Sequence, residues 1–189
     1  MMGKKYVKVG VALLFTLVCD FIITEYSLSS EETKKDSRTN YEKFLKEKTH
    51  WCSTMVISCS DFRFGMATQE LVNNVLGFME DYDYFAIPGS IKNMLNSETR
   101  ELVLSTFGIS VQLHHVKRIV IITHEDCIGY GGSRTFGTYK EEEEKYTIKD
   151  MKKARRLMRI RFPHLKVHLF YGKIIFEEEK RVYKFEQID

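Results

Sequence analysis

The sequence predicts an α/β domain in which a mainly parallel β-sheet is flanked by helices. Short apolar, β-branched segments alternate along the chain with longer segments of helical periodicity, which is the pattern of strand–helix–strand units. The clearest strand, 118–123, is apolar almost without interruption, as expected of a parallel strand covered on both faces. With 189 residues, of which 43% are hydrophobic, the chain has enough apolar material for one buried core.

The first 29 residues differ from the rest of the chain. Three lysines precede the apolar run 9–23, in which Asp20 is the only charge. A basic head before such a run is typical of a secretory signal or a signal anchor, so we expect residues 1–29 to direct export or membrane anchoring. Residues 30–189 are then the folded domain. The alternatives are an N-terminal helix that packs on a neighbouring subunit, and a cytoplasmic location.

The first half of the domain is expected to contain a linker, two helices and two strands. Residues 29–40 are polar and charged, as in a linker, and a helix is expected over 38–48. The segment 54–59 is too short and too β-branched to favour a helix, so it is predicted to be a strand. The spacing of leucines and valines predicts a helix over 66–78. A second strand over 84–87 is stopped by a Pro–Gly pair.

The second half continues the alternation. An apolar stripe predicts a helix over 91–107, which leads to the strand at 118–123. A long amphipathic helix is expected over 142–161, where it ends before a proline. The segment 167–171 is a further strand, and 181–185 is expected to return beside it as a hairpin partner.

Two short polar segments stand where predicted strands end. The first is Cys59-Ser60-Asp61-Phe62-Arg63, and the second is His124-Glu125-Asp126-Cys127. If the chain stays extended, its alternation sends Cys59, Asp61 and Arg63 to one side. Because sites in open parallel sheets form beyond the carboxyl ends of the strands, both segments lie where a site is expected.

The residue types in these two segments point to a metal. The four cysteines of the chain are too few and too scattered for a disulfide scaffold. Cys59, His124 and Cys127 offer two thiolates and one imidazole, which are ligands that Zn²⁺ prefers, and three protein ligands leave a fourth position open for catalysis. Asp61 can accept a proton or a hydrogen bond from zinc-bound water while Arg63 holds its carboxylate. Alternatively, Asp61 turns away from Arg63 and fills the fourth position itself.

At these residues the chain resembles the β-class carbonic anhydrases, in which a Cys-x-Asp-x-Arg segment follows the first core strand and a His-x-x-Cys segment follows a later one. The stretches "SCSDFRF", "IPGS" and "THEDCIGYGG" are most similar to a compact branch of that family, and the resemblance covers about residues 54–171. It implies zinc held by the three ligands above, with Asp61 and Arg63 as a catalytic dyad. It also implies a homodimer or higher homo-oligomer and the reversible hydration of carbon dioxide to bicarbonate by zinc-bound hydroxide.

Two alternative functions use the same site. A hydrolase of carbonyl sulfide or carbon disulfide would direct the same nucleophile at a different carbon. A non-catalytic zinc-binding domain would keep the fold and the metal without turnover.

The chain departs from the family in two places near the site. Residues 86–90 read Ala-Ile-Pro-Gly-Ser, where better-characterised members carry an Arg-Asn-Ala-Gly-Asn-like stretch, so the polar contacts of the pocket are expected to differ. Ile128 stands where a glycine commonly follows the second zinc cysteine, and Gly129 comes one residue later. Three aromatic residues are expected to line the pocket or a subunit interface: Phe62, Phe64 and Tyr84.

The remaining polar residues favour structural roles. Cys52 is expected to be a small buried hydrophobic residue. His114 and His115 are adjacent on a helix and therefore point apart. The acidic run 141–144 is expected to be a solvated helix start. The arginines within 155–161 alternate with apolar residues, and the net charge is only +3, so no nucleic-acid partner is expected.

Overall fold

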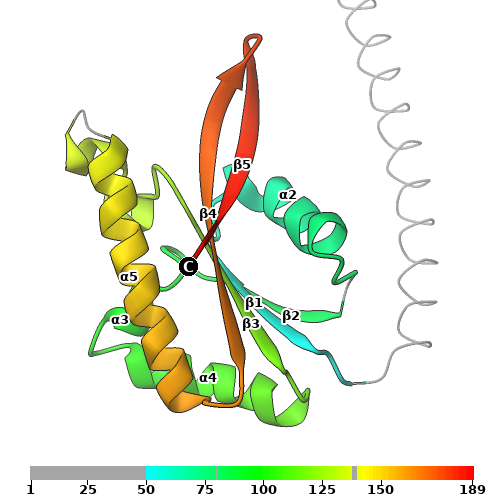
Figure 1. The fold of residues 1–189 in the computed structure, drawn as a ribbon. Coiled ribbons are helices and arrows are strands. Elements are labelled where there is room, and N and C mark those ends of the chain that lie inside the picture. The colour runs from blue at the N-terminus through cyan, green and yellow to red at the C-terminus, as the bar shows by residue number, and fades with distance from the viewer. Residues whose placement is uncertain (1–49, 80, 138–139) are drawn as a thin grey trace, which may run out of the picture. The chain divides into compact units, whose positions relative to one another are not determined.

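The computed structural model describes residues 50–79, 81–137 and 140–189, which contain a five-stranded, mostly parallel β-sheet (Figure 1). In the order in which they lie side by side, the strands are β2 (Tyr82–Ala86), β1 (Thr54–Ser58), β3 (Arg118–His124), β4 (Lys166–Glu177) and β5 (Lys180–Ile188). The first four are parallel, and β5 runs antiparallel to β4. The predicted α/β class is confirmed, and so is the C-terminal hairpin. β4 extends beyond the predicted 167–171 because its second half pairs with β5.

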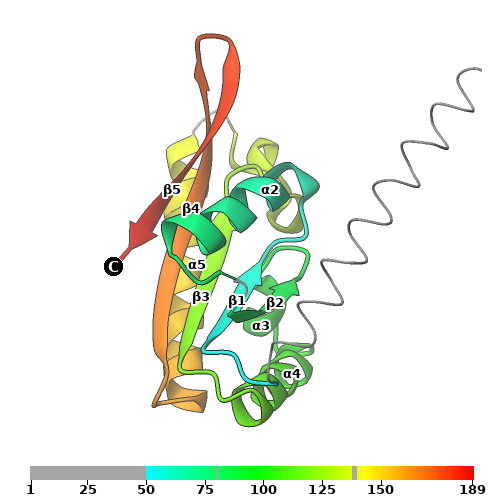
Figure 2. The ribbon, with the colours of Figure 1, turned by 90° about the vertical axis from the view of Figure 1, so that its right-hand side faces the viewer.

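Helices cover the two faces of the sheet unequally (Figures 1 and 2). One face carries three helices, which are α3 (Lys92–Leu95), α4 (Arg100–Leu113) and α5 (Lys140–Arg161). Among the described residues, the other face carries α2 and the π-helical turn that continues it, at Phe62–Glu70 and Leu71–Val75. The sheet is therefore the middle layer of three.

Side chains alternate between the two faces along the central strands, so each strand contributes to two cores. In β3, Ile119 and Ile121 lie in the larger core with α3, α4 and α5, whereas Val120 and Ile122 lie in the smaller core with the residues that follow α2. All four side chains are at most 2% exposed. This double coverage explains why residues 119–122 are all apolar.

The helix predicted over 91–107 is wrong, because the structure has two helices there. α3 ends at Leu95 and α4 begins at Arg100. The side chain of Arg100 donates hydrogen bonds to the carbonyl oxygens of Met94 and Leu95, at 3.2 and 3.0 Å, and thereby satisfies the end of α3. Within the break, the side chain of Asn96 accepts a hydrogen bond from the backbone of Glu98.

The start of the preceding helix also differs from the prediction of 66. α2 begins at Phe62, because the carboxylate of Asp61 accepts a hydrogen bond from the backbone N–H of Arg63 and caps the helix. The motif alone suggested an extended chain through Arg63, but in the structure the chain is already helical from Phe62 onward.

The hydrophobic segment 1–29, the linker 29–40 and the helix predicted over 38–48 lie outside the described residues. Among the residues that the structure describes, every helix is too short or too polar to qualify as a membrane-spanning segment.

Burial in the larger core should contribute strongly to the stability of the fold. Ile121 is fully buried in β3, whereas Ile160 on α5 is 79% exposed. Ile121→Ala is expected to lower the free energy of unfolding by about 2–5 kcal/mol, because it removes buried methyl groups and leaves a cavity. The matched variant Ile160→Ala should change it by less than about 0.5 kcal/mol. Urea unfolding of the two variants measures the difference, and equal losses would contradict this description of the core.

Candidate metal centre

The structure brings Cys59, His124 and Cys127 together at the carboxyl ends of β1 and β3. These two strands are parallel neighbours, so their ends meet at one edge of the sheet. Cys59 directly follows β1, His124 is the last residue of β3, and Cys127 follows in the next turn. One ligand atom from each residue lies within 4.8 Å of the other two. The two segments singled out in the sequence therefore meet in space.

The geometry of these three side chains fits a tetrahedral metal ion. The Sγ atoms of Cys59 and Cys127 are 3.7 Å apart. Two sulfurs bound at about 2.3 Å with a tetrahedral angle between them would be ~3.8 Å apart. The Nδ1 of His124 lies 2.7 Å from the carbonyl oxygen of Glu125 and must donate to it, which leaves Nε2 with a free lone pair. That Nε2 is buried and has no hydrogen-bond partner among the described residues.

The two thiols share one hydrogen bond. The bond from Cys127 lowers the pKa of Cys59 to about 4, against the opposing effect of burial. The same interaction raises the pKa of Cys127. The backbone N–H groups of Gly89 and Asp61 also face the Cys59 sulfur. The shared hydrogen bond therefore favours the loss of one thiol proton, and with it the binding of a cation.

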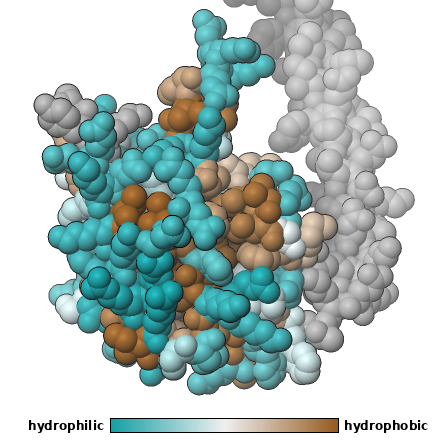
Figure 3. All heavy atoms as spheres, viewed as in Figure 1, coloured by the Kyte–Doolittle hydropathy of each residue, from teal (hydrophilic) through white to brown (hydrophobic). Residues whose placement is uncertain are grey.

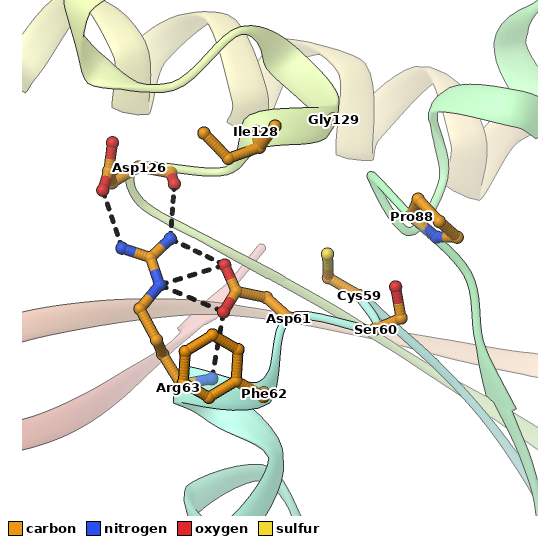
Figure 4. A pocket seen from close by; sticks show the side chains of 9 residues that line it. All are labelled: Cys59, Ser60, Asp61, Phe62, Arg63, Pro88, Asp126, Ile128 and Gly129. Carbon is orange, nitrogen blue, oxygen red and sulfur yellow. Dashed lines mark hydrogen bonds and ion pairs between the residues drawn. The ribbon is translucent and has the colours of Figure 1, made fainter.

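Asp61 lies beside these three ligands and is held by Arg63 (Figure 4). The Nε of Arg63 donates to both carboxylate oxygens, at 3.0 and 3.1 Å, and Nη2 donates to Oδ2 at 2.6 Å. These bonds hold the pKa of Asp61 below its usual value. Oδ2 of Asp61 is 4.0 Å from Nε2 of His124, too far for a hydrogen bond. The carboxylate is therefore bound to Arg63 and has not turned toward the three ligands.

Arg63 also binds a second carboxylate that the motif did not indicate. Its Nη1 donates to Oδ2 of Asp126 at 2.7 Å, and its Nη2 donates to the backbone carbonyl of Asp126 at 2.8 Å. Asp126 has a left-handed backbone, with φ of 52°, which is uncommon for a residue other than glycine. The Arg63 side chain thus connects the end of β1 to the turn after β3.

The sequence suggested that the acidic start of α5 is solvated. The structure shows instead that one of its glutamates is buried. Glu143 is only 1% exposed. Its carboxylate accepts a hydrogen bond from the backbone N–H of Asp126 at 2.7 Å and one from the hydroxyl of Ser133 at 2.5 Å. The sequence did contain a signal for this. Extending the buried stripe of α5 backwards from Met151 by helical spacing reaches Thr147 and then Glu143.

Two glycines allow the loops of the site to meet. A Cβ atom at Gly129 would lie 2.4 Å from the Cα of Gly89, so the backbones touch at a distance that no side chain permits. Gly89 itself has a left-handed backbone, with φ of 75°, which favours glycine at that position. Segment 86–90 contributes the Gly89 N–H near Cys59, together with Pro88 in the cleft wall.

A cleft of about 440 Å³ opens beside the three ligands. Phe62, Pro88 and Ile128 line it together with Asp61 and Arg63 (Figure 4). Exposed apolar side chains also gather on the side of the molecule that carries α2 (Figure 3).

Of the three aromatic residues expected to line the pocket or an interface, Phe62 alone lies in the cleft wall. Phe64 is buried and stacks on the ring of His124, with centroids 4.2 Å apart, so it supports that ring instead. Tyr84 lies on β2 and accepts a hydrogen bond from Ser58.

Comparisons with known proteins bear on the family and the fold. The sequence model of the family described as "Putative carbonic anhydrase" matches residues 49–178. An uncharacterized protein of Rickettsia bellii is 32% identical over 124 residues, which are 62% of this chain and 74% of that protein. An uncharacterized protein of Rickettsia conorii is 28% identical over 176 residues, or 90% of this chain and 91% of that protein. Among solved structures, the β-carbonic anhydrase CafA of Aspergillus fumigatus matches with a TM-score of 0.50 and 16% identity, over 89% of this chain and 90% of that one. This last likeness shows a shared fold.

The buried glutamate should matter more than its neighbours in the acidic run. Glu143→Ala leaves the N–H of Asp126 and the hydroxyl of Ser133 without their acceptor, so the free energy of unfolding is expected to fall by about 1–3 kcal/mol. Glu142→Ala removes an exposed carboxylate from the same helical turn and should change it by less than about 0.5 kcal/mol. Chemical denaturation of both variants measures this. The same loss in both would mean that Glu143 does not brace the turn.

Proposed function

Because the chain belongs to the family described as putative carbonic anhydrases, we propose that it is a zinc-dependent lyase that reversibly hydrates carbon dioxide to bicarbonate. One observation carries the proposal. Two cysteine sulfurs and a buried imidazole nitrogen converge beside a carboxylate that an arginine already binds. This combination provides a metal site with one open position and an acid–base group next to it.

Cys59, His124 and Cys127 would hold the zinc. When bound, zinc would lower the pKa of a water in its open coordination position and so provide a nucleophile at neutral pH. The protein's own contribution begins with the imidazole of His124, which the Glu125 carbonyl orients from one side and the Phe64 ring supports from below.

Asp61 is the acid–base group in this proposal. Its carboxylate accepts four hydrogen bonds from Arg63, one from the backbone and three from the guanidinium. These bonds orient the carboxylate and keep it ionised, so it can accept a hydrogen bond from the attacking water. Arg63 is then a positioning residue, and Asp126 and Glu143 position Arg63 in turn.

The cleft suits a small apolar substrate. Phe62, Pro88 and Ile128 contribute apolar wall, and Phe62 and Ile128 are 90% and 75% exposed in the single chain. Apolar surface at the mouth of a site is where a second copy of the chain would pack, so a homodimer or higher homo-oligomer is part of the proposal.

Stopped-flow hydration of carbon dioxide by the zinc-loaded full chain tests the proposed reaction. Zinc-dependent turnover above the buffer rate is the expected result. Hydrolysis of carbonyl sulfide without hydration of carbon dioxide would favour the hydrolase instead. Full zinc content with neither activity would favour a non-catalytic zinc domain.

The ligand set has its own test. Cys127→Ser replaces a thiolate by a neutral hydroxyl, a poor zinc ligand, so the zinc bound at this centre should be lost. Metal analysis after dialysis measures the loss. Cys19→Ser, outside the described residues, is the matched control and should keep the metal content of the parent. Unchanged zinc in Cys127→Ser would exclude Cys127 as a ligand.

Asp61 and Arg63 should behave as one unit. Arg63→Ala frees the carboxylate to move toward the metal ligands, and Asp61→Asn removes the charged acceptor. Each is expected to lower carbon dioxide hydration about 100-fold or more while zinc content is retained. The double variant should be little worse than the poorer single variant.

Arg159→Ala, which removes an exposed arginine from α5, serves as the control and should keep full activity. Losses that add in the double variant would mean that the two residues act independently.

A further inference from the structure

We propose that Cys52, Asp83 and His114 form a second site for a zinc-type divalent cation. It lies at the amino ends of the parallel strands, whereas the centre described above lies at their carboxyl ends. Cys52 lies just before β1, Asp83 is the second residue of β2, and His114 caps the C-terminus of α4. All three therefore lie at the amino ends of the parallel strands, whereas Cys59 and His124 lie at the carboxyl ends. The proposal does not depend on the proposed function.

The donor atoms are close enough to share one ion. A thiol sulfur, an imidazole nitrogen and a carboxylate oxygen from these residues lie within 4.8 Å of one another. Sulfur, nitrogen and carboxylate oxygen are all accepted by zinc. Nδ1 of His114 is 2.7 Å from Oδ2 of Asp83, so the proton on Nδ1 forms a hydrogen bond to the carboxylate. A bound zinc would replace that proton and move the two atoms to ~3.3 Å apart, a shift that side-chain rotation provides.

Backbone hydrogen bonds hold the segments that carry the three residues. The N–H of Cys52 donates to the carbonyl oxygen of His114 at 3.0 Å, which joins the start of β1 to the end of α4. The carboxylate of Asp81 accepts hydrogen bonds from the backbone and the hydroxyl of Ser53, which joins the start of β2 to the start of β1. The ligands are therefore held in place before a cation arrives, which lowers the cost of binding it.

A cleft of about 200 Å³ adjoins the trio and leaves room for a water as the fourth ligand. Cys52 and His114 line it, together with Asp81 and Lys117. The Asp83 carboxylate adjoins this lining through its hydrogen bond with His114, and His115 is the other basic side chain in the cleft wall.

An activated cysteine is the other chemistry that a Cys–His–Asp trio suggests, and the geometry opposes it. The Cys52 sulfur donates to the carbonyl oxygen of Thr54 at 3.5 Å, and no hydrogen bond joins it to His114 among the described residues. Burial raises the pKa of Cys52 to about 11, so the thiol is protonated and a poor nucleophile until a metal displaces its proton.

Zinc stoichiometry of the full chain tests the second site. After saturation with Zn²⁺ and dialysis, the parent chain should bind two ions, and Cys52→Ser and His114→Asn should each bind one. Cys19→Ser and His164→Asn are the matched controls and should keep two. One ion in the parent that survives both Cys52→Ser and His114→Asn would overturn the proposal, and so would two ions in both variants.

Cobalt separates this inference from the proposed function. With Co²⁺ bound to Cys127→Ser, thiolate-to-cobalt absorption at a one-sulfur site should remain, and Cys52→Ser in that background should abolish it. A parent chain whose single ion is lost in Cys52→Ser but kept in Cys127→Ser would support the second site and refute the zinc centre. Absorption unaffected by Cys52→Ser would refute the second site whatever the first one does.

Discussion

The arrangement of the site depends on the hydrogen bonds and ion pairs of the Arg63 guanidinium group. This group binds the Asp61 carboxylate on the β1 side, and on the β3 side it binds both the carboxylate and the backbone carbonyl of Asp126. Each of these acids is adjacent, or nearly so, to one of the two cysteines. The distance between the sulfurs is thus set by a charged bridge as well as by the pairing of two strands. The bridge is partly exposed. The buried Glu143 stabilises it, because its carboxylate accepts a hydrogen bond from the backbone N–H of Asp126.

The residues at the start of α2 have two roles: they begin the helix, and they form part of the site. Asp61 caps the helix and also places its carboxylate 4.0 Å from Nε2 of His124, so the change from strand to helix takes place within the site itself. Because Phe62 begins the helix, Phe62 points into the cleft wall, whereas Phe64 turns underneath His124. A longer strand would have placed Arg63 on the same side but would have removed this support from the imidazole.

Much of this could be predicted from the sequence, because it depends on local patterns. The apolar runs located the strands, and the residue types at two strand ends indicated the three side chains that the structure brings together. The missed features depend on particular side-chain contacts, some of them local and others between segments distant in the chain. The break at Asn96–Thr99 depends on the side chain of Arg100 reaching back to carbonyl groups of α3. The role of Asp126 depends on the position of Arg63, and the proximity of Cys52 to His114 depends on a loop folding against β1. No periodicity in the sequence carries that information.

The contact between Gly89 and Gly129 limits how a protein with this site can diverge. Any side chain at Gly129 would force the two loops apart and withdraw the backbone N–H of Gly89 from the Cys59 sulfur. Pro88 and Ile128 lie directly beside the contact and line the cleft, so they can change without a clash between the two glycines. These two positions can alter the width and polarity of the opening while the glycine contact stays intact. Proteins that share the glycine contact can therefore differ in which molecules enter the cleft.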